Sequence, residues 1–152
     1  MALNPDFIGR EFPPTAPYEI SRLKLAEFAD AIGDPNPLYR DRAAAVAAGF
    51  PDVIAPPTFP IVIGAAASRH LMADPELGLN YAMVVHGEQR FSYARPMRAG
   101  DVIIAQATIT DIKQAGRNAV LATSTRFTTS DGEHVCTAYA TLVERAAEAD
   151  GS

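Results

Sequence analysis

The sequence is poor in the residues that build disulfides, metal sites and covalent catalytic centres. It contains one cysteine, Cys136, and no tryptophan among 152 residues, so an internal disulfide is excluded. The cysteine and the three histidines form no cluster with the spacing of zinc ligands. There is also no Gly-x-Ser-x-Gly elbow and no glycine-rich phosphate loop. We therefore expect no metal and no cofactor, and we interpret Cys136 as a small buried strand residue.

A basic net charge and long apolar runs are absent as well. The 13 basic and 18 acidic residues give a net charge of -5, which disfavours a general nucleic-acid binder. The longest apolar run, 61–67, is far shorter than the roughly 20 residues that span a bilayer. The first six residues lack the basic and apolar regions of a secretory signal. These features predict a cytoplasmic protein with neither a nucleic-acid nor a membrane partner.

Lysine is scarce, because 11 of the 13 basic residues are arginine. Arg90, Arg95 and Arg98 lie close together around Phe91 and Tyr93. Guanidinium groups suit bidentate contacts with phosphate, so this group could hold the phosphate of coenzyme A or of phosphopantetheine. A solvated charged edge is the alternative interpretation.

Apolar residues recur at helical spacing in three segments. The first follows Ser21, a common N-cap, and precedes Gly33, a common C-terminal cap. Two prolines then prevent the helix from continuing beyond Asp34. The pair Pro56-Pro57 introduces the third segment, since proline is tolerated in a first helical turn. The predicted helices are 22–32, 41–48 and 58–72.

From residue 82 onward the pattern changes to strands separated by turn signals. The predicted strands are 83–94, 102–112, 119–129 and 135–143, with a short early strand at 18–20. An antiparallel sheet curved around one apolar helix is an α+β arrangement, the hot-dog fold. The length fits one domain. We place this domain at 1–145 and a flexible C-terminal tail at 146–152.

Four local motifs carry a resemblance to a known family. In order, they are Asp34-Pro35-Asn36-Pro37-Leu38, Ala55-Pro56-Pro57-Thr58-Phe59, Val85-His86-Gly87-Glu88-Gln89-Arg90-Phe91 and Arg95-Pro96-Met97-Arg98-Ala99-Gly100-Asp101. Together they resemble the MaoC-like hot-dog hydratases and dehydratases, and more closely the FAS1-like dehydratase N-terminal type. The resemblance implies (R)-specific chemistry on acyl thioesters. It also implies similarity to the non-catalytic-type subunit of bacterial (3R)-hydroxyacyl-ACP dehydratases, which work as dimers of hot dogs.

The resemblance also identifies candidate catalytic residues, with one departure from the family pattern. An Asp opens the family's catalytic loop and a His closes it five residues later. Here Asp34 occupies the first position, but Tyr39 replaces the histidine. A phenol with an ordinary pKa of about 10 is a poor base at neutral pH. The alternative role for Asp34 is to initiate a turn whose backbone amides satisfy its carboxylate.

The other candidate residues are expected to bind substrate. They are Asn36, Pro57, Thr58, Phe59, His86 and Gly87. The prolines at 56 and 57 fall near the position where the catalytic type uses a backbone N–H as an oxyanion donor, and proline has no N–H. We expect Thr58 and Phe59 to retain free first-turn amides. For His86 the alternative is a structural role in a half-buried strand.

Three functions follow from this pattern. In the first, the chain shapes the acyl channel of a 3-hydroxyacyl-thioester dehydratase or enoyl-thioester hydratase, while a paralogous hot-dog subunit supplies the catalytic Asp and His. In the second, a homodimeric hydratase uses Asp34 with a non-standard partner residue. The third is an acyl-thioester-binding module without chemistry. The expected ligand is an acyl-CoA or acyl-carrier-protein thioester in each case, and function must be argued from the site because the fold alone does not choose.

Overall fold

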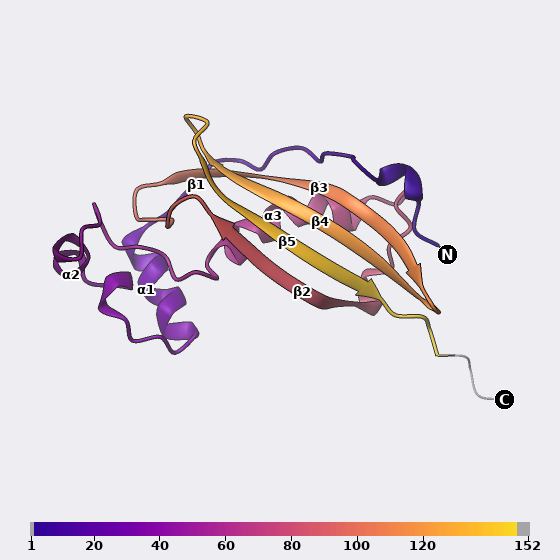
Figure 1. Ribbon diagram of the computed structural model, residues 1–152, viewed down its shortest axis with the longest axis horizontal. Coiled ribbons are helices and arrows are strands. Elements are labelled where there is room, and N and C mark those ends of the chain that lie inside the picture. The colour runs from indigo at the N-terminus through magenta and orange to yellow at the C-terminus, as the bar shows by residue number, and fades with distance from the viewer. Residues whose placement is uncertain (1, 149–152) are drawn as a thin grey trace.

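The structure is a computed structural model that describes residues 2–148 (Figure 1). Its helices are η1 Pro5–Phe7, α1 Arg22–Ala31, η2 Pro37–Tyr39, α2 Arg42–Ala47, α3 Pro60–Ala73 and η3 Tyr81–Met83, where η denotes a 3-10 turn. Its strands are β1 Tyr18–Glu19, β2 Val84–Tyr93, β3 Val102–Ala115, β4 Asn118–Thr129 and β5 His134–Glu144. Each predicted helix and strand is present.

One curled antiparallel sheet, in the order β1-β3-β4-β5-β2, forms the body of the molecule. Helix α3 lies across the concave side of this sheet, while α1 and α2 gather at one end (Figure 1). The main core lies between α3 and the sheet and includes Phe59, Ile63, Ile103 and Phe127, all at most 2% exposed. This arrangement confirms the predicted α+β hot-dog fold.

The ends of α1 agree with the predicted signals, but α3 begins two residues later than expected. The Ser21 hydroxyl accepts a hydrogen bond from the Lys24 N–H, and Gly33 has a φ of 72°, a backbone conformation that favours glycine. At α3 the first helical residue is Pro60. Pro56 and Pro57 instead form part of a preceding turn, which the Phe59 N–H closes onto the Pro56 carbonyl.

The N-terminal segment covers the β3 edge of the sheet (Figure 1). Three of its amides donate to β3 carbonyls: Gly9 to Ile109 at 2.7 Å, Phe12 to Ala107 at 2.9 Å and Thr15 to Ala105 at 2.9 Å. The Phe12 side chain is 4% exposed and packs with Phe7 beneath the segment. Together with β1, this segment satisfies much of an edge that would otherwise be open.

The opposite edge is formed by β2, and no other strand of residues 2–148 pairs with its outer side. Six consecutive residues, 85–90, are exposed. The register with β5 shifts between His86 and Glu88, which places a β-bulge at Gly87. A Cβ at Gly87 would lie 3.3 Å from Val143 Cγ2, so a larger residue would crowd β5.

The predicted tail at 146–152 falls partly outside the described residues. Within the part that is described, the Ala146 N–H donates to Asn118 Oδ1 at 3.0 Å, and Arg117 donates to the Ala147 carbonyl at 3.3 Å. Residues 149–152 lie outside the described range. No helix in residues 2–148 is long and apolar enough to cross a membrane.

Candidate active site

The loop after α1 forms a pair of overlapping turns. The Asp34 carboxylate accepts a hydrogen bond from the Asn36 N–H at 3.0 Å, and the Asn36 side chain accepts one from the Leu38 N–H at 3.0 Å. Arg40 donates to the Asp34 carbonyl and to the Asp30 carboxylate. Asp34 therefore initiates a local turn, as its position before proline allows. Its side chain remains partly exposed, so the carboxylate is still accessible.

Tyr39 closes this loop and is buried, with 7% of its surface exposed. Burial raises the pKa of its phenol, and the negative charge of Asp34 raises it further, while Asn36 acts in the opposite direction. The phenol is therefore protonated at neutral pH. It can donate a hydrogen bond but cannot accept a proton in the way that a histidine would.

The turn before α3 brings the second part of the candidate site together. The Tyr93 hydroxyl on β2 donates to the Pro57 carbonyl at 2.6 Å. Burial raises the pKa of Tyr93 as well, which keeps this donor protonated. Pro57 and Thr58 are both exposed. The sequence did not single out Tyr93 as a site residue, although its alternation with Phe91 could have placed both side chains on one face of the strand.

The expectation of two free amides in this turn is only half correct. The Phe59 N–H donates to the Pro56 carbonyl at 2.9 Å, so it is occupied. The Phe59 side chain lies fully buried between Phe28 and Tyr18, where it contributes to the core. The Thr58 N–H has no hydrogen-bond partner among residues 2–148. It is the amide of this turn that remains available for a ligand oxygen.

A short ladder of backbone hydrogen bonds connects the loop with this turn. The Ile54 N–H donates to the Leu38 carbonyl at 3.0 Å, and the Ala55 N–H donates to the Met97 carbonyl at 2.7 Å. The Ala99 N–H donates to the Val53 carbonyl at 3.0 Å. Residues 53–55 therefore lie between the loop and residues 97–99, and they lead directly into the turn. Both parts of the candidate site are held by the same segment.

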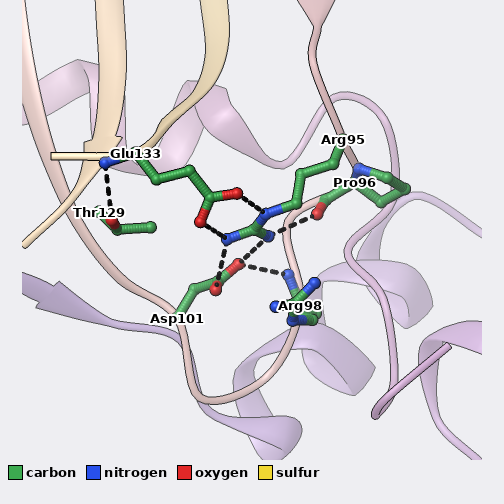
Figure 2. A network of polar contacts seen from close by, with 6 residues as sticks. All are labelled: Arg95, Pro96, Arg98, Asp101, Thr129 and Glu133. Carbon is green, nitrogen blue, oxygen red and sulfur yellow. Dashed lines mark hydrogen bonds and ion pairs between the residues drawn. The ribbon is translucent and has the colours of Figure 1, made fainter. Parts of the chain in front are cut away.

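Arg95 anchors residues 97–99 to the sheet (Figure 2). It donates two hydrogen bonds to Asp101, at 2.9 and 3.0 Å, and two to Glu133, at 2.8 and 3.3 Å. The Arg98 N–H also donates to the Asp101 carboxylate, at 3.0 Å. These carboxylates raise the pKa of Arg95, while Arg95 lowers that of Glu133.

This network overturns the idea of a phosphate site built from three arginines. The donors of Arg95 are directed at Asp101, Glu133 and the Pro96 carbonyl (Figure 2). The guanidinium of Arg90 instead lies 4.1 Å from the centre of the Tyr139 ring. The sequence suggested a common ligand because the three residues are close in the chain, but the side chains of Arg90 and Arg95 contact different groups of the protein.

A cavity of about 830 Å³ lies between α3 and the concave face of the sheet. Its walls are mainly apolar and many of the side chains are small, including Gly64, Ala65, Ala107, Ala138 and Ala140. Ligand sites commonly have volumes of about 300 to 1,000 Å³ and apolar linings. The cavity therefore has the size and chemistry of a site for an apolar ligand.

Among residues 2–148, no hydrogen bond or ion pair joins any of the three histidines to the loop that contains Tyr39. His86 is exposed and lines the cavity, but it is seven residues along β2 from Tyr93, a distance of about 20 Å. His70 is exposed in the last turn of α3. His134 forms a hydrogen bond with Thr137 at 2.8 Å. Gly87, next to His86, forms the bulge described above.

Other catalytic chemistries find little support in the structure. Cys136 is fully buried, and burial raises the pKa of its thiol to about 11, so it is unreactive in the native state. Within residues 2–148, no group of three or more His, Cys, Asp or Glu side chains is placed to hold a metal ion. The Asp34 loop and the Thr58 amide remain as the candidate site, and the cavity, whose lining begins at Pro60 and includes neither Asp34 nor Thr58, lies next to it along α3.

The curled sheet around α3, with a turn and a cavity along this helix, defines a hot-dog protein. The family described as the FAS1-like dehydratase domain region matches residues 6–138, and the chain belongs to this family. It is also similar to a UPF0336 protein of Thermobifida fusca. The two are 52% identical over 145 residues, which cover 95% of each chain.

Solved structures show the same architecture. A MaoC-like dehydratase has a TM-score of 0.86 and 29% identity, over 93% of this chain and 43% of its own length. The chain therefore spans less than half of that protein. The C-terminally truncated HadBC (3R-hydroxyacyl-ACP dehydratase) complex from Mycobacterium tuberculosis has a TM-score of 0.82 and 25% identity. That comparison covers 91% of this chain and 97% of the other.

Proposed function

We propose that this chain is the substrate-binding subunit of an (R)-specific 3-hydroxyacyl-thioester dehydratase, which in reverse is an enoyl-thioester hydratase. A partner hot-dog subunit supplies the catalytic Asp and His. The observation that carries the proposal is the buried Tyr39, whose raised pKa leaves the loop of Asp34 without a base of the imidazole type.

The chemistry explains why the partner is needed. Dehydration removes a proton from C2 of the 3-hydroxyacyl thioester and releases the C3 hydroxyl as water, which leaves a C2–C3 double bond. One group must accept the C2 proton and one must donate a proton to the leaving hydroxyl. The thioester oxygen gains negative charge and needs an N–H donor. This chain offers the N–H donor at Thr58, but the protonated phenol of Tyr39 cannot act as the base, and no hydrogen bond among residues 2–148 brings a histidine to this loop.

The bare edge of β2 supports a partner of the same fold. Its outer side is unpaired and residues 85–90 are exposed, so a strand of another subunit could extend the sheet there. His86 and Gln89 also line the cavity from this edge. A subunit placed along β2 would therefore border the groove, which fits a site shared by two chains. We place an acyl-CoA or acyl-carrier-protein thioester in this groove.

The test separates the contributions of the two subunits. The purified chain alone should not hydrate crotonyl-CoA, whereas the complex with its paralogous partner should consume the enoyl absorbance. Within that complex, Tyr39→Phe in this chain should retain most activity, because the phenol performs no proton transfer. Replacement of the loop histidine of the partner by alanine should abolish it. Turnover by the chain alone that disappears in Asp34→Asn would contradict the proposal and identify a homodimeric hydratase.

A gain-of-function variant examines the loop itself. Tyr39→His restores an imidazole five residues after Asp34, so this chain should acquire hydratase activity at least about a hundredfold above background. Asp34→Asn combined with Tyr39→His is the matched control and should remain inactive. If Tyr39→His and wild type both bind the thioester but neither turns it over in any pairing, the chain is a binding module.

A further inference from the structure

We propose that Tyr93 is a positioning residue, which holds the Pro57–Thr58 peptide unit in the orientation that presents the Thr58 N–H to the thioester oxygen. The identity of the ligand rests on the proposed function. The role of Tyr93 is inferred from the turn itself, and it belongs to a side chain that lies outside the four motifs of the family resemblance.

The Pro57 carbonyl and the Thr58 N–H belong to a single peptide unit. A peptide unit is planar, and in the trans form its C=O and N–H point in opposite directions. No cis peptide bond occurs in residues 2–148. The Tyr93 hydroxyl donates to the Pro57 oxygen at 2.6 Å, which is at the short end of the range for O–H···O hydrogen bonds. By holding this oxygen, the phenol also directs the Thr58 N–H away from itself.

The phenol replaces a backbone donor that the sequence cannot supply. A carbonyl at the start of a helix normally accepts from the N–H three or four residues later. For Pro57 the first of these residues is Pro60, which has no N–H. The second is Ile61, whose N–H donates instead to the Thr58 carbonyl at 3.2 Å. Among residues 2–148, Tyr93 is therefore the hydrogen-bond partner of the Pro57 carbonyl.

The same peptide unit is the central one of a β-turn, which has two possible orientations. The Phe59 N–H closes this turn onto the Pro56 carbonyl at 2.9 Å. Type I and type II turns share that hydrogen bond and both accept proline at the second position, but φ of the third residue differs by about 170° between them. Type II needs a positive φ there. No non-glycine residue in 2–148 has a positive φ, so the turn at Thr58 is not of type II.

Two features keep the peptide unit in this orientation. Thr58 is β-branched, so a positive φ is sterically unfavourable for it. The second feature is Tyr93, because rotation would carry the Pro57 oxygen away from its hydroxyl. The Thr58 N–H adds no restraint of its own, since it has no hydrogen-bond partner among residues 2–148.

Tyr93 is a suitable anchor because its backbone belongs to the sheet. It is the last residue of β2 and lies opposite Cys136 of β5. The next amide, of Ala94, donates to the Val135 carbonyl at 2.8 Å. The ring packs against the main core beside Phe91, with 6.5 Å between the two ring centres. A donor on a rigid strand can thus hold a turn that lacks internal hydrogen bonds to this carbonyl.

The first experiment compares Tyr93→Phe with wild type in the complex with the partner subunit. Removal of an oxyanion donor lowers kcat by about 10² to 10³, and a donor that is misdirected for part of the time should cost less. We expect kcat for crotonyl-CoA to fall about tenfold and KM to stay within about twofold, because the interaction strengthens as charge develops. A rise in KM with kcat unchanged would overturn the inference.

Tyr139→Phe is the matched control, because it makes the same chemical change elsewhere in the sheet. Tyr139 is 38% exposed and lies on β5 between the cavity-lining residues Ala138 and Ala140, so it faces the other side of the sheet. Its kinetic constants should equal those of wild type. An equal fall in kcat for both variants would also overturn the inference.

A glycine at position 58 tests whether Tyr93 controls the orientation of the peptide unit. Glycine adopts a positive φ readily and keeps the N–H. Thr58→Gly alone should lower kcat by about threefold or less, because Tyr93 still holds the Pro57 carbonyl. Combined with Tyr93→Phe, it should lower kcat by at least about a hundredfold, which exceeds the product of the single effects. A combined effect equal to that product would contradict the role assigned to Tyr93.

A spectroscopic measurement separates this inference from the proposed function. Butyryl-CoA, isotope-labelled at its carbonyl carbon, is bound to the chain in its native oligomeric state, and infrared difference spectra report the hydrogen bond to the thioester oxygen without turnover. Wild type should lower the stretching frequency of this carbonyl, and Tyr93→Phe should lose most of that shift. If Tyr93→Phe does not fold, Tyr93→Met is the second variant without a hydroxyl and should show the same loss.

The outcomes of this measurement are distinct. An equal shift in wild type and variant, or no shift in wild type, would disprove the inference whether or not the complex is active. A shift that depends on Tyr93, without turnover in any pairing, would disprove only the proposed function. A lower melting temperature of Tyr93→Phe with an unchanged shift would show that the phenol acts on stability alone, which is also contrary to the inference.

Discussion

The two edges of the sheet differ, because one is covered by the chain and the other is not. The β3 edge is covered by β1 and by an N-terminal segment that donates from Gly9, Phe12 and Thr15 to its carbonyls. The β2 edge has ten residues and no strand on its outer side within residues 2–148. An uncovered edge is a template for pairing, and proteins usually protect it. The contrast agrees with the proposal that a partner pairs with β2, whereas β3 is covered by the chain itself.

The largest expected effect is a difference in the free energy of unfolding between a substitution at the β3 edge and one at the β2 edge. Phe12 is 4% exposed beneath the segment that covers β3, whereas Val85 on β2 is 46% exposed. Phe12→Ala should lower the free energy of unfolding by about 4 kcal/mol, because it removes a buried ring and leaves a cavity. Val85→Ala should change it by less than about 0.5 kcal/mol in the isolated chain. Urea denaturation measures both, and similar losses would contradict the distinction.

The next effect concerns the network at the end of β2. Arg95→Met should destabilise the chain by about 3 kcal/mol, because it leaves Asp101, 8% exposed, without its charged partner. Glu133→Gln is the control, since Glu133 is 54% exposed and a surface ion pair contributes little to stability. The melting temperatures of the two variants give the comparison. Equal melting temperatures would show that the ion pair of Arg95 with Asp101 does not account for the stability that Arg95 contributes.

Hydrogen exchange probes the edges themselves. The Ala105 and Ile109 amides of β3 donate to the N-terminal segment and should exchange slowly in every state. Amides on the outer side of β2 should exchange at least about a hundredfold faster in dilute isolated chain and become protected in the complex. Mass spectrometry of peptic fragments reports both strands in one sample. Unchanged exchange of β2 in an active complex would place the partner elsewhere.

The smallest expected effect on stability comes from an ion pair that lies away from both edges. Hydrogen bonds from Arg22 on α1 lower the pKa of Asp52 to about 2. Because the pKa is lower in the folded chain, the ion pair stabilises it above about pH 4, the ordinary value, and this stability is lost as the pH falls toward 2. Asp52→Asn should therefore cost about 1 kcal/mol at neutral pH, after allowance for solvent screening.

The pH dependence provides the check. The difference between wild type and Asp52→Asn should shrink across the range from pH 4 to pH 2, as followed by urea denaturation at each pH. The exchange of the β2 and β3 amides at neutral pH should be the same in both proteins. A constant difference at all pH values would show that Asp52 acts by packing and not by its charge.

Local signals in the sequence were enough to predict most of the fold. Alternation and turn residues located the strands, and Ser21 and Gly33 located the ends of α1. The start of α3 was misplaced because Pro56, Pro57 and Pro60 are all compatible with a first helical turn, and only the hydrogen bonds show that Pro60 occupies it.

Features that depend on distant residues were less predictable. The carboxylates that occupy Arg95 lie 6 and 38 positions away in the sequence, so the arginine was interpreted with its neighbours instead. The N-terminal segment has no strand pattern, because its contacts with β3 are widely spaced. The role of Tyr93 depends on a carbonyl 36 positions earlier. In the candidate site, the replacement of a histidine by Tyr39 was visible from the sequence, but the burial of the phenol was not.

The buried thiol of Cys136 can report how often β5 opens. It is the sole cysteine and lies fully buried on β5 next to β2, so an alkylating reagent cannot reach it in the folded state. Alkylation can therefore occur only while β5 is transiently open, so the labelling rate measures that opening without an engineered probe. If the partner adds a strand to β2, the rate should fall in its presence.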